Sequence, residues 1–177
     1  HQKERRFDLS LQYQADTFDD YFFFNKLRFG CGMRNLQTIV SGEYHFPLID
    51  EVKRHLQERE VDLPFHIEMY LQIYELYTGD QPEQNFRRLQ ELIRKYGAAV
   101  EPQEMREIYL AAINYCARQI RSGDRSYYQN ALDLYLNGIE TKALFEGPYL
   151  SHWTYTNVVK LALALQRFDW LEGFIND

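Results

Sequence analysis

The stretch Pro102–Lys142, PQEMREIYLAAINYCARQIRSGDRSYYQNALDLYLNGIETK, decides the fold class. In its first half, apolar and small residues recur at steps of three and four, which places them on one side of a helix from about Pro102 to Arg121: Met105, Ile108, Ala112, Cys116 and Ile120. Gly123-Asp124 interrupts this pattern, and a second helical pattern runs from about Ser126 to Lys142. The stretch therefore predicts two helices joined by a short turn.

The same periodicity extends over most of the chain. It predicts further helices at Phe18–Val40, Pro47–Arg59, Pro64–Thr78 and Pro82–Tyr96, one that Ser151 caps, and a last one that Asp169 caps. Proline stands in the first turn of several of these helices, as helix-start preferences favour. Apolar and polar residues nowhere alternate over four or more positions, so no strand is predicted. We expect an all-α protein of seven or eight helices.

Turns recur along the chain at a nearly constant interval. Ser41-Gly42, Gly79-Asp80, Gly123-Asp124 and Gln166-Arg167 follow one another after 37, 44 and 43 residues. This spacing defines units at 18–60, 64–97, 102–145 and 151–177, of which the last is incomplete. A two-helix unit of about 40 residues cannot bury its own apolar faces, so stacking into an α-solenoid is predicted. We expect one repeat domain over residues 1–177, cut from a longer chain.

The unit at 102–145 resembles the tetratricopeptide-repeat family. Cys116 occupies the family's small position on the first helix, Gly123-Asp124 its turn, and Ala131, Tyr135 and Gly138 its positions on the second helix. The resemblance implies a right-handed superhelix of antiparallel helix pairs that binds a peptide or helix of a partner protein on its concave face. Units of 37 to 44 residues exceed the family's 34, and in the last unit Val159, Gln166, Leu171 and Ile175 match poorly. The C-terminal part is also similar to uncharacterised bacterial repeat proteins.

The resemblance also places candidate partner-binding residues on the first helix of each pair. Asn114 and Asn157 are 43 residues apart, and each stands nine residues before its turn; the same count before Gly79 reaches Tyr70. In peptide-binding members of the family, an asparagine at this place bonds the ligand backbone or carboxylate, with basic residues nearby. Arg121 and Lys160 are the candidate bases, and Trp153 is a candidate apolar wall. In the alternative interpretation, both asparagines bond the backbone of a neighbouring helix.

The predicted helix Pro64–Thr78 carries two apolar stripes. One contains Phe65, Met69, Ile73 and Leu76, and the other Tyr70, Tyr74 and Tyr77. Two stripes indicate either a helix covered on both sides or one that shows its second stripe to a partner. A different class of function is a small-ligand site or enzyme on this tyrosine-rich face around Tyr70, with His66 as general base.

Composition and spacing exclude several other classes. The chain carries a net charge of −6, so nucleic acid is not an expected partner. Its longest apolar run is six residues, Ile108–Ile113, so no transmembrane segment is expected, and we expect a cytoplasmic protein. Cys31 and Cys116 lie on apolar helix stripes and are expected to be buried. The histidines lack zinc-ligand spacing, so neither a metal nor a cofactor is expected.

Overall fold

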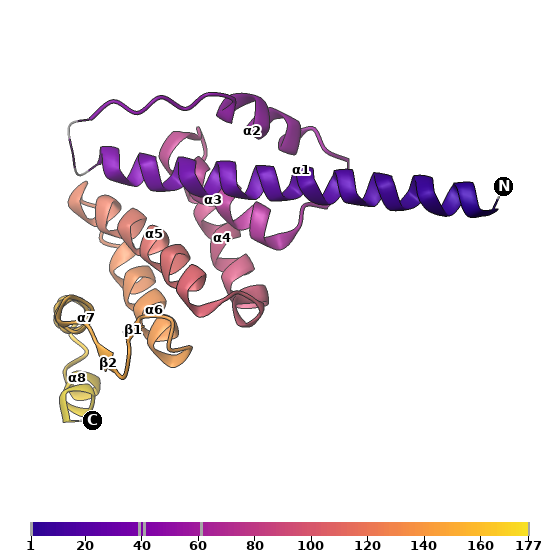
Figure 1. Cartoon of the computed structure of the whole chain (residues 1–177). Helices are drawn as coiled ribbons and strands as arrows, with labels where there is room; N and C mark the ends of the chain where they lie inside the picture. The colour runs from indigo at the N-terminus through magenta and orange to yellow at the C-terminus, as the bar shows by residue number, and fades with distance from the viewer. Residues whose placement is uncertain (1, 39, 41, 61, 177) are drawn as a thin grey trace. The chain divides into compact units, whose positions relative to one another are not determined.

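The computed structural model describes residues 2–38, 40, 42–60 and 62–176, with side chains from Leu9 onward (Figure 1). The described residues form eight α-helices: α1 Gln2–Gln37, α2 Ile49–Gln57, α3 Phe65–Thr78, α4 Pro82–Tyr96, α5 Pro102–Arg121, α6 Tyr127–Glu140, α7 His152–Ala164 and α8 Phe168–Asn176. A 3-10 turn spans Gly97–Ala99, and two short strands are β1 Phe145–Glu146 and β2 Tyr149–Leu150. The prediction of an all-α fold is confirmed for this part of the chain.

Three local predictions were wrong. The first helix begins at Gln2 instead of Phe18, and the last begins at Phe168, so Asp169 lies in its first turn instead of capping it. The strands β1 and β2 form an antiparallel hairpin in which Phe145 pairs with Leu150, although no strand was predicted. Gly147 has a φ of 67° in the first central position of the turn, the conformation that a type II′ hairpin needs. A two-residue ladder is too short to show an alternating pattern.

The chain divides into two compact units, one up to Leu92 and one from Ile93. The sequence predicts one continuous repeat domain instead, and the division falls inside α4. The regular stacking of helix pairs into a solenoid stays a prediction.

In the first unit, α1 packs one face against α2 and α3. Leu27, Gly30 and Cys31 are buried on this face. A Cβ atom on Gly30 would lie 3.2 Å from Ile49 Cδ1 of α2 and 3.3 Å from a ring carbon of Tyr74 of α3. The absence of a side chain at Gly30 therefore lets both helices approach α1 closely.

Most residues of both stripes of α3 are buried, and the two at its ends, Phe65 and Tyr77, are half-buried. Met69, Ile73 and Leu76 of the first stripe are buried, as are Tyr70 and Tyr74 of the second. Of the two interpretations of this helix, packing on both sides is the one that the structure supports.

A buried carboxylate links α2 and α3. Glu75 of α3 is buried, and its Oε1 lies 3.0 Å from Lys53 Nζ and accepts a hydrogen bond of 3.1 Å from Gln57 Nε2. Lys53 and Gln57 stand four residues apart on α2, so both reach the same oxygen.

In the second unit, α5 and α6 pack side by side. Ala112 and Cys116 of α5 and Leu132 of α6 are fully or almost fully buried. After α6 the chain turns back through Lys142, whose φ is 60°, and Leu144 N donates to the carbonyl of Gly138 at 3.0 Å. The side chain of Leu144 then covers Gly138, where a Cβ atom would lie only 2.6 Å from Leu144 Cδ1. Gly138 is therefore the point where the returning chain meets α6.

The predicted N-cap of α7 is confirmed. Ser151 precedes the helix with extended backbone, and its side chain accepts a hydrogen bond of 3.2 Å from Thr154 N. Replacing Ser151 with alanine is expected to lower the free energy of unfolding by about 1 kcal/mol, and replacing it with glycine by only a few tenths. Urea unfolding followed by circular dichroism measures both values, and an alanine variant as stable as wild type would contradict the capping role.

Candidate functional site

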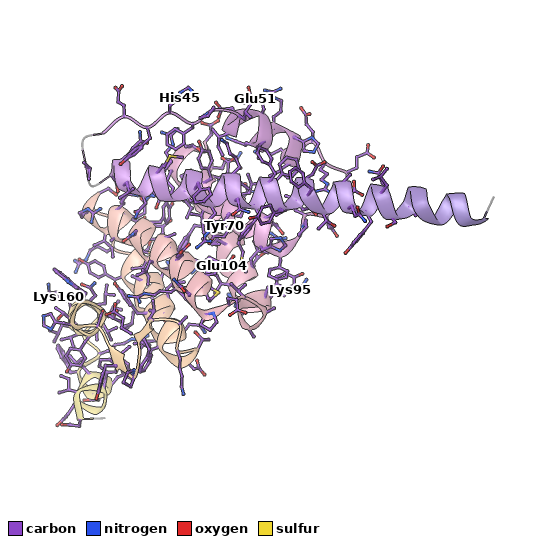
Figure 2. The ribbon with its side chains drawn as sticks, in the orientation of Figure 1. His45, Glu51, Tyr70, Lys95, Glu104 and Lys160 are labelled. Atoms are coloured by element: carbon purple, nitrogen blue, oxygen red, sulfur yellow. The ribbon has the colours of Figure 1, made fainter. Side chains whose placement is uncertain are left out.

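The strongest candidate site is a side of α7 that carries Trp153, Asn157 and Lys160. These residues follow one another at steps of four and three, so they share one face of the helix. The indole of Trp153 is 75% exposed, Lys160 is exposed, and Asn157 is half-buried. Figure 2 labels Lys160 on α7. We call these three residues the α7 face.

The half-buried member of the α7 face is held by α6. Asn157 Nδ2 donates a hydrogen bond of 2.9 Å to the hydroxyl of Tyr135. Burial raises the pKa of Tyr135, and the bond from Asn157 opposes part of that rise, so the phenol is protonated at neutral pH. Within the described part of the chain, this is the one hydrogen bond of the Asn157 side chain. A side chain fixes this asparagine, where the alternative interpretation expected a helix backbone.

Tyr135 is a residue of this site that its sequence position did not predict. It was assigned only a packing position on the second helix, and its hydroxyl also sets the orientation of the Asn157 amide. The inner stripe of α6 predicts burial of this ring but not the partner of its hydroxyl.

The other predicted residues of the second unit lie on α5. Asn114 and Arg121 are seven residues apart on that helix, and both are exposed. Asn114 and Arg121 thus share one face of α5, and Trp153, Asn157 and Lys160 share one face of α7. A single groove that contains both groups stays a prediction.

Tyr70 was wrongly predicted to lie on a partner surface. Its side chain is 2% exposed, and its ring meets the ring of Phe24 edge-on at 5.4 Å. Figure 2 labels Tyr70 in the first unit, where α3 passes α1. Counting nine residues back from Gly79 finds a position on α3 but does not reveal that α1 covers this side.

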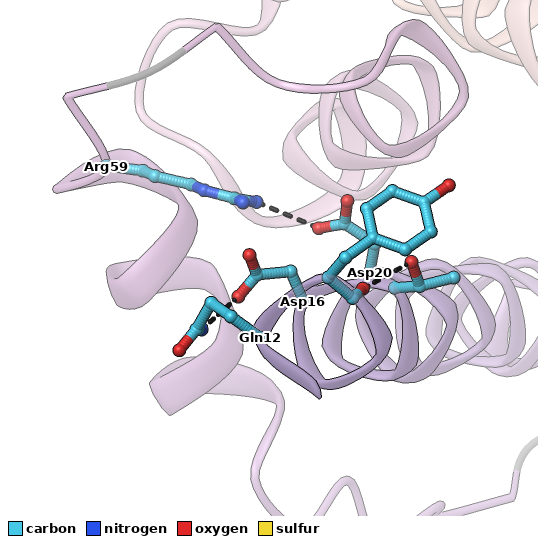
Figure 3. Close-up of polar contacts among 6 residues, drawn as sticks. Gln12, Asp16, Asp20 and Arg59 are labelled. Carbon is cyan, nitrogen blue, oxygen red and sulfur yellow. Dashed lines mark hydrogen bonds and ion pairs between the residues drawn. The ribbon is translucent and has the colours of Figure 1, made fainter. Parts of the chain in front are cut away.

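The alternative site around His66 and Tyr70 is also affected by the burial of Tyr70. His66 is half-buried, with the rings of Phe24 and Phe65 at 5.3 Å and 5.5 Å. Burial lowers the pKa of His66, and the negative charge of Asp20 opposes part of this shift. Asp20 forms an ion pair of 2.9 Å with Arg59 (Figure 3). Because Tyr70 is enclosed, His66 and Tyr70 do not form an open site together.

The lowered pKa of His66 predicts how stability depends on pH. The unfolded chain binds a proton at His66 near pH 6.5 and the folded chain only at lower pH, so folding stability falls as the pH drops below about 6.5. Below the pKa of His66 in the folded chain the stability stops falling and stays at its lowered value, because both states are then protonated. Replacing His66 with glutamine is expected to flatten the stability curve in this range. Thermal unfolding of both proteins between pH 7 and pH 5 tests this, and equal slopes would contradict it.

The two cysteines are buried, as predicted. Burial raises the pKa of Cys116 to about 12 and that of Cys31 further, so both thiols are protonated at neutral pH and are poor nucleophiles. Among the described residues, no three His, Cys, Asp or Glu side chains come close enough to hold a metal ion. None of the helices in this part of the chain combines the length and the apolar character needed to cross a membrane.

Comparison with protein-family models, with curated proteins and with solved structures found no match for this chain. The likeness to tetratricopeptide repeats rests on the residues of the sequence alone.

Proposed function

We propose that this chain is a non-catalytic protein-interaction module that binds an extended segment of a partner protein on the α7 face. The observation that carries the proposal is the indole of Trp153, three-quarters exposed beside an oriented amide and a lysine. Tryptophan is, with tyrosine and arginine, one of the side chains enriched among the residues that dominate binding energy at protein interfaces.

Each residue of the α7 face has a distinct role in this proposal. The indole of Trp153 offers a flat apolar surface to a ligand side chain. The Asn157 amide keeps its carbonyl oxygen and one N–H for the ligand main chain, because Tyr135 takes the other N–H. Lys160 supplies a positive charge in a chain of net charge −6, which favours a carboxylate.

The spacing of the α7 face defines the ligand further. Trp153 and Lys160 are seven residues apart, a rise of about 10.5 Å along a helix. An extended segment covers that length with about three residues. The preferred ligand therefore carries an apolar side chain about three residues before a carboxylate, such as the one at a chain end. Asn114 and Arg121 on α5 are the candidates for further contacts along a longer segment.

Affinity selection from a library of random peptides with free C-termini tests this proposal. The wild-type protein is expected to enrich peptides with an apolar residue near the third position before the end. Trp153→Ala is expected to weaken binding of an enriched peptide at least tenfold. Tyr149→Ala is a matched control, because Tyr149 is 74% exposed in the hairpin, outside the α7 face. Tyr149→Ala is expected to enrich the same peptides as wild type. If Trp153→Ala enriches them as well, the α7 face is not the binding surface.

A further inference from the structure

The long helix α1 carries a second apolar face that the described residues of the first unit leave largely exposed. Its residues alternate at steps of four and three: Leu11, Ala15, Phe18, Phe22, Asn25, Phe29, Gly32 and Leu36. We call this row the α1 seam. Rows of this spacing are the contact lines of paired helices in coiled coils. The five large apolar side chains of the seam are between 39% and 69% exposed.

The α1 seam lies opposite the face that packs against α2 and α3. Leu27, Gly30 and Cys31 are buried on the packed face, about half a helical turn from Phe29 and Phe18. A Cβ atom on Gly30 would meet Ile49 and Tyr74, whereas one on Gly32 would meet nothing within 4 Å. A helix that approached the seam would therefore leave the contacts of α1 with α2 and α3 in place.

The α1 seam of one copy matches the α1 seam of a second copy that runs in the opposite direction. When two copies of α1 run antiparallel and residue numbers that add to 47 face one another, every seam residue meets a seam residue of the other copy. The layers are then Leu11 with Leu36, Ala15 with Gly32, Phe18 with Phe29, and Phe22 with Asn25, each formed twice. In three of the four layers the facing residues are alike in size: leucine meets leucine, alanine meets glycine, and a ring meets a ring. In the fourth layer the ring of Phe22 covers the side chain of Asn25.

The charges that flank the seam favour the same register. Asp19 is exposed beside Phe18, and Lys26 stands beside Asn25 on the same edge of the seam. In the antiparallel register the same edges of the two copies meet, and Lys26 of each copy is level with residue 21 of the other, about 3 Å along the helix axis from Asp19. Asp19 and Lys26 of opposite copies are therefore neighbours across the seam, and two opposite-charge pairs form. Parallel copies would place Asp19 beside Gln14 of the second copy and form no such pair. From this complementarity we propose that the chain pairs with a second copy of itself through antiparallel α1 seams.

The polar residue in the seam is compatible with burial. Asn25 Nδ2 donates a hydrogen bond of 2.8 Å to the carbonyl of Tyr21 in its own helix, so the amide keeps a partner when a ring of the other copy covers it. A polar residue at a seam position disfavours other registers.

The apolar area that two α1 seams can bury against each other reaches the size of a specific interface. Phenylalanine rings bury about 150–250 Å² each when covered, so the exposed parts of the six rings in two copies amount to roughly 700 Å². The exposed parts of the leucines raise this to roughly 1,000 Å², the lower bound for a stable protein–protein contact.

Sedimentation equilibrium of the full chain tests the pairing. Wild type is expected to show twice the monomer mass of 21.3 kDa at micromolar concentration. Phe18→Ser is expected to weaken association at least tenfold, because it empties two layers. Tyr13→Ser is the matched control: Tyr13 is equally exposed on α1 but lies outside the seam, so its replacement should leave the association constant unchanged. Circular dichroism establishes that both variants keep their helix content.

Charge reversal distinguishes the antiparallel register from every other pairing. Asp19→Lys alone and Lys26→Asp alone each place like charges opposite one another, and each is expected to weaken self-association about tenfold. An equimolar mixture of the two variants is expected to restore the dimer, because each lysine then has an aspartate as its neighbour across the seam. The double variant Asp19→Lys/Lys26→Asp is expected to pair like wild type. A wild type that is monomeric at 100 μM, or single variants that their mixture does not rescue, would overturn the proposal.

Discussion

Replacing Lys53 with methionine is expected to lower the free energy of unfolding by about 2 kcal/mol. The substitution keeps the aliphatic stem but removes the charged partner of the buried Glu75 carboxylate, so that Gln57 is its one remaining side-chain partner among the described residues. Removing one partner of a buried ion pair commonly costs about 3–5 kcal/mol, and the partial exposure of Lys53 reduces this figure. Equilibrium unfolding in urea measures the loss.

The double variant Lys53→Met/Glu75→Leu supplies the control. It removes both charges and fills the space with apolar atoms, so it is expected to recover most of the lost stability. A single variant as stable as wild type would show that water solvates Glu75 freely. A double variant as unstable as the single would show that the loss came from packing instead of charge.

Replacing Gly138 with alanine is expected to cost about 2 kcal/mol of stability. The new methyl group would lie 2.6 Å from Leu144 Cδ1 and 2.7 Å from Leu144 Cγ, and Leu144 is itself buried. Leu144 cannot move without disturbing the turn that brings it onto α6, and overpacking of this kind costs about 1–3 kcal/mol.

Gly173→Ala is the matched control for this substitution. Gly173 also lies within a helix, but a Cβ atom there would meet nothing within 4 Å. Alanine is the better helix former, so this variant is expected to gain up to about 1 kcal/mol. If Gly138→Ala were also stabilising, the close approach of Leu144 would be contradicted.

Local signals in the sequence predicted the helices well. The bounds of α5 were predicted without error, because Pro102 starts the helix and Gly123 follows its end. The N-cap at Ser151 and the burial of both cysteines were also predicted. The first turns of α1 were missed because Leu9, Leu11 and Tyr13 are exposed and form no single buried stripe.

The candidate site was less predictable, because it depends on which helices cover one another. Asn157 and Tyr135 are 22 residues apart, and their hydrogen bond follows from the packing of α6 against α7. Tyr70 has the same position relative to its turn as Asn114, yet Tyr70 is enclosed and Asn114 is exposed. Periodicity predicts the face of a helix on which a residue lies, whereas its accessibility depends on the neighbouring helices.

The affinity of one selected peptide, measured as its free acid and as its C-terminal amide, tests the proposed function most directly. The two forms are titrated against wild type and against Lys160→Ala. If Lys160 binds the terminal carboxylate, amidation is expected to weaken binding to wild type about tenfold and to leave binding to Lys160→Ala unchanged. Equal weakening of both proteins on amidation, or of neither, would contradict the assignment of the α7 face as the ligand-binding surface.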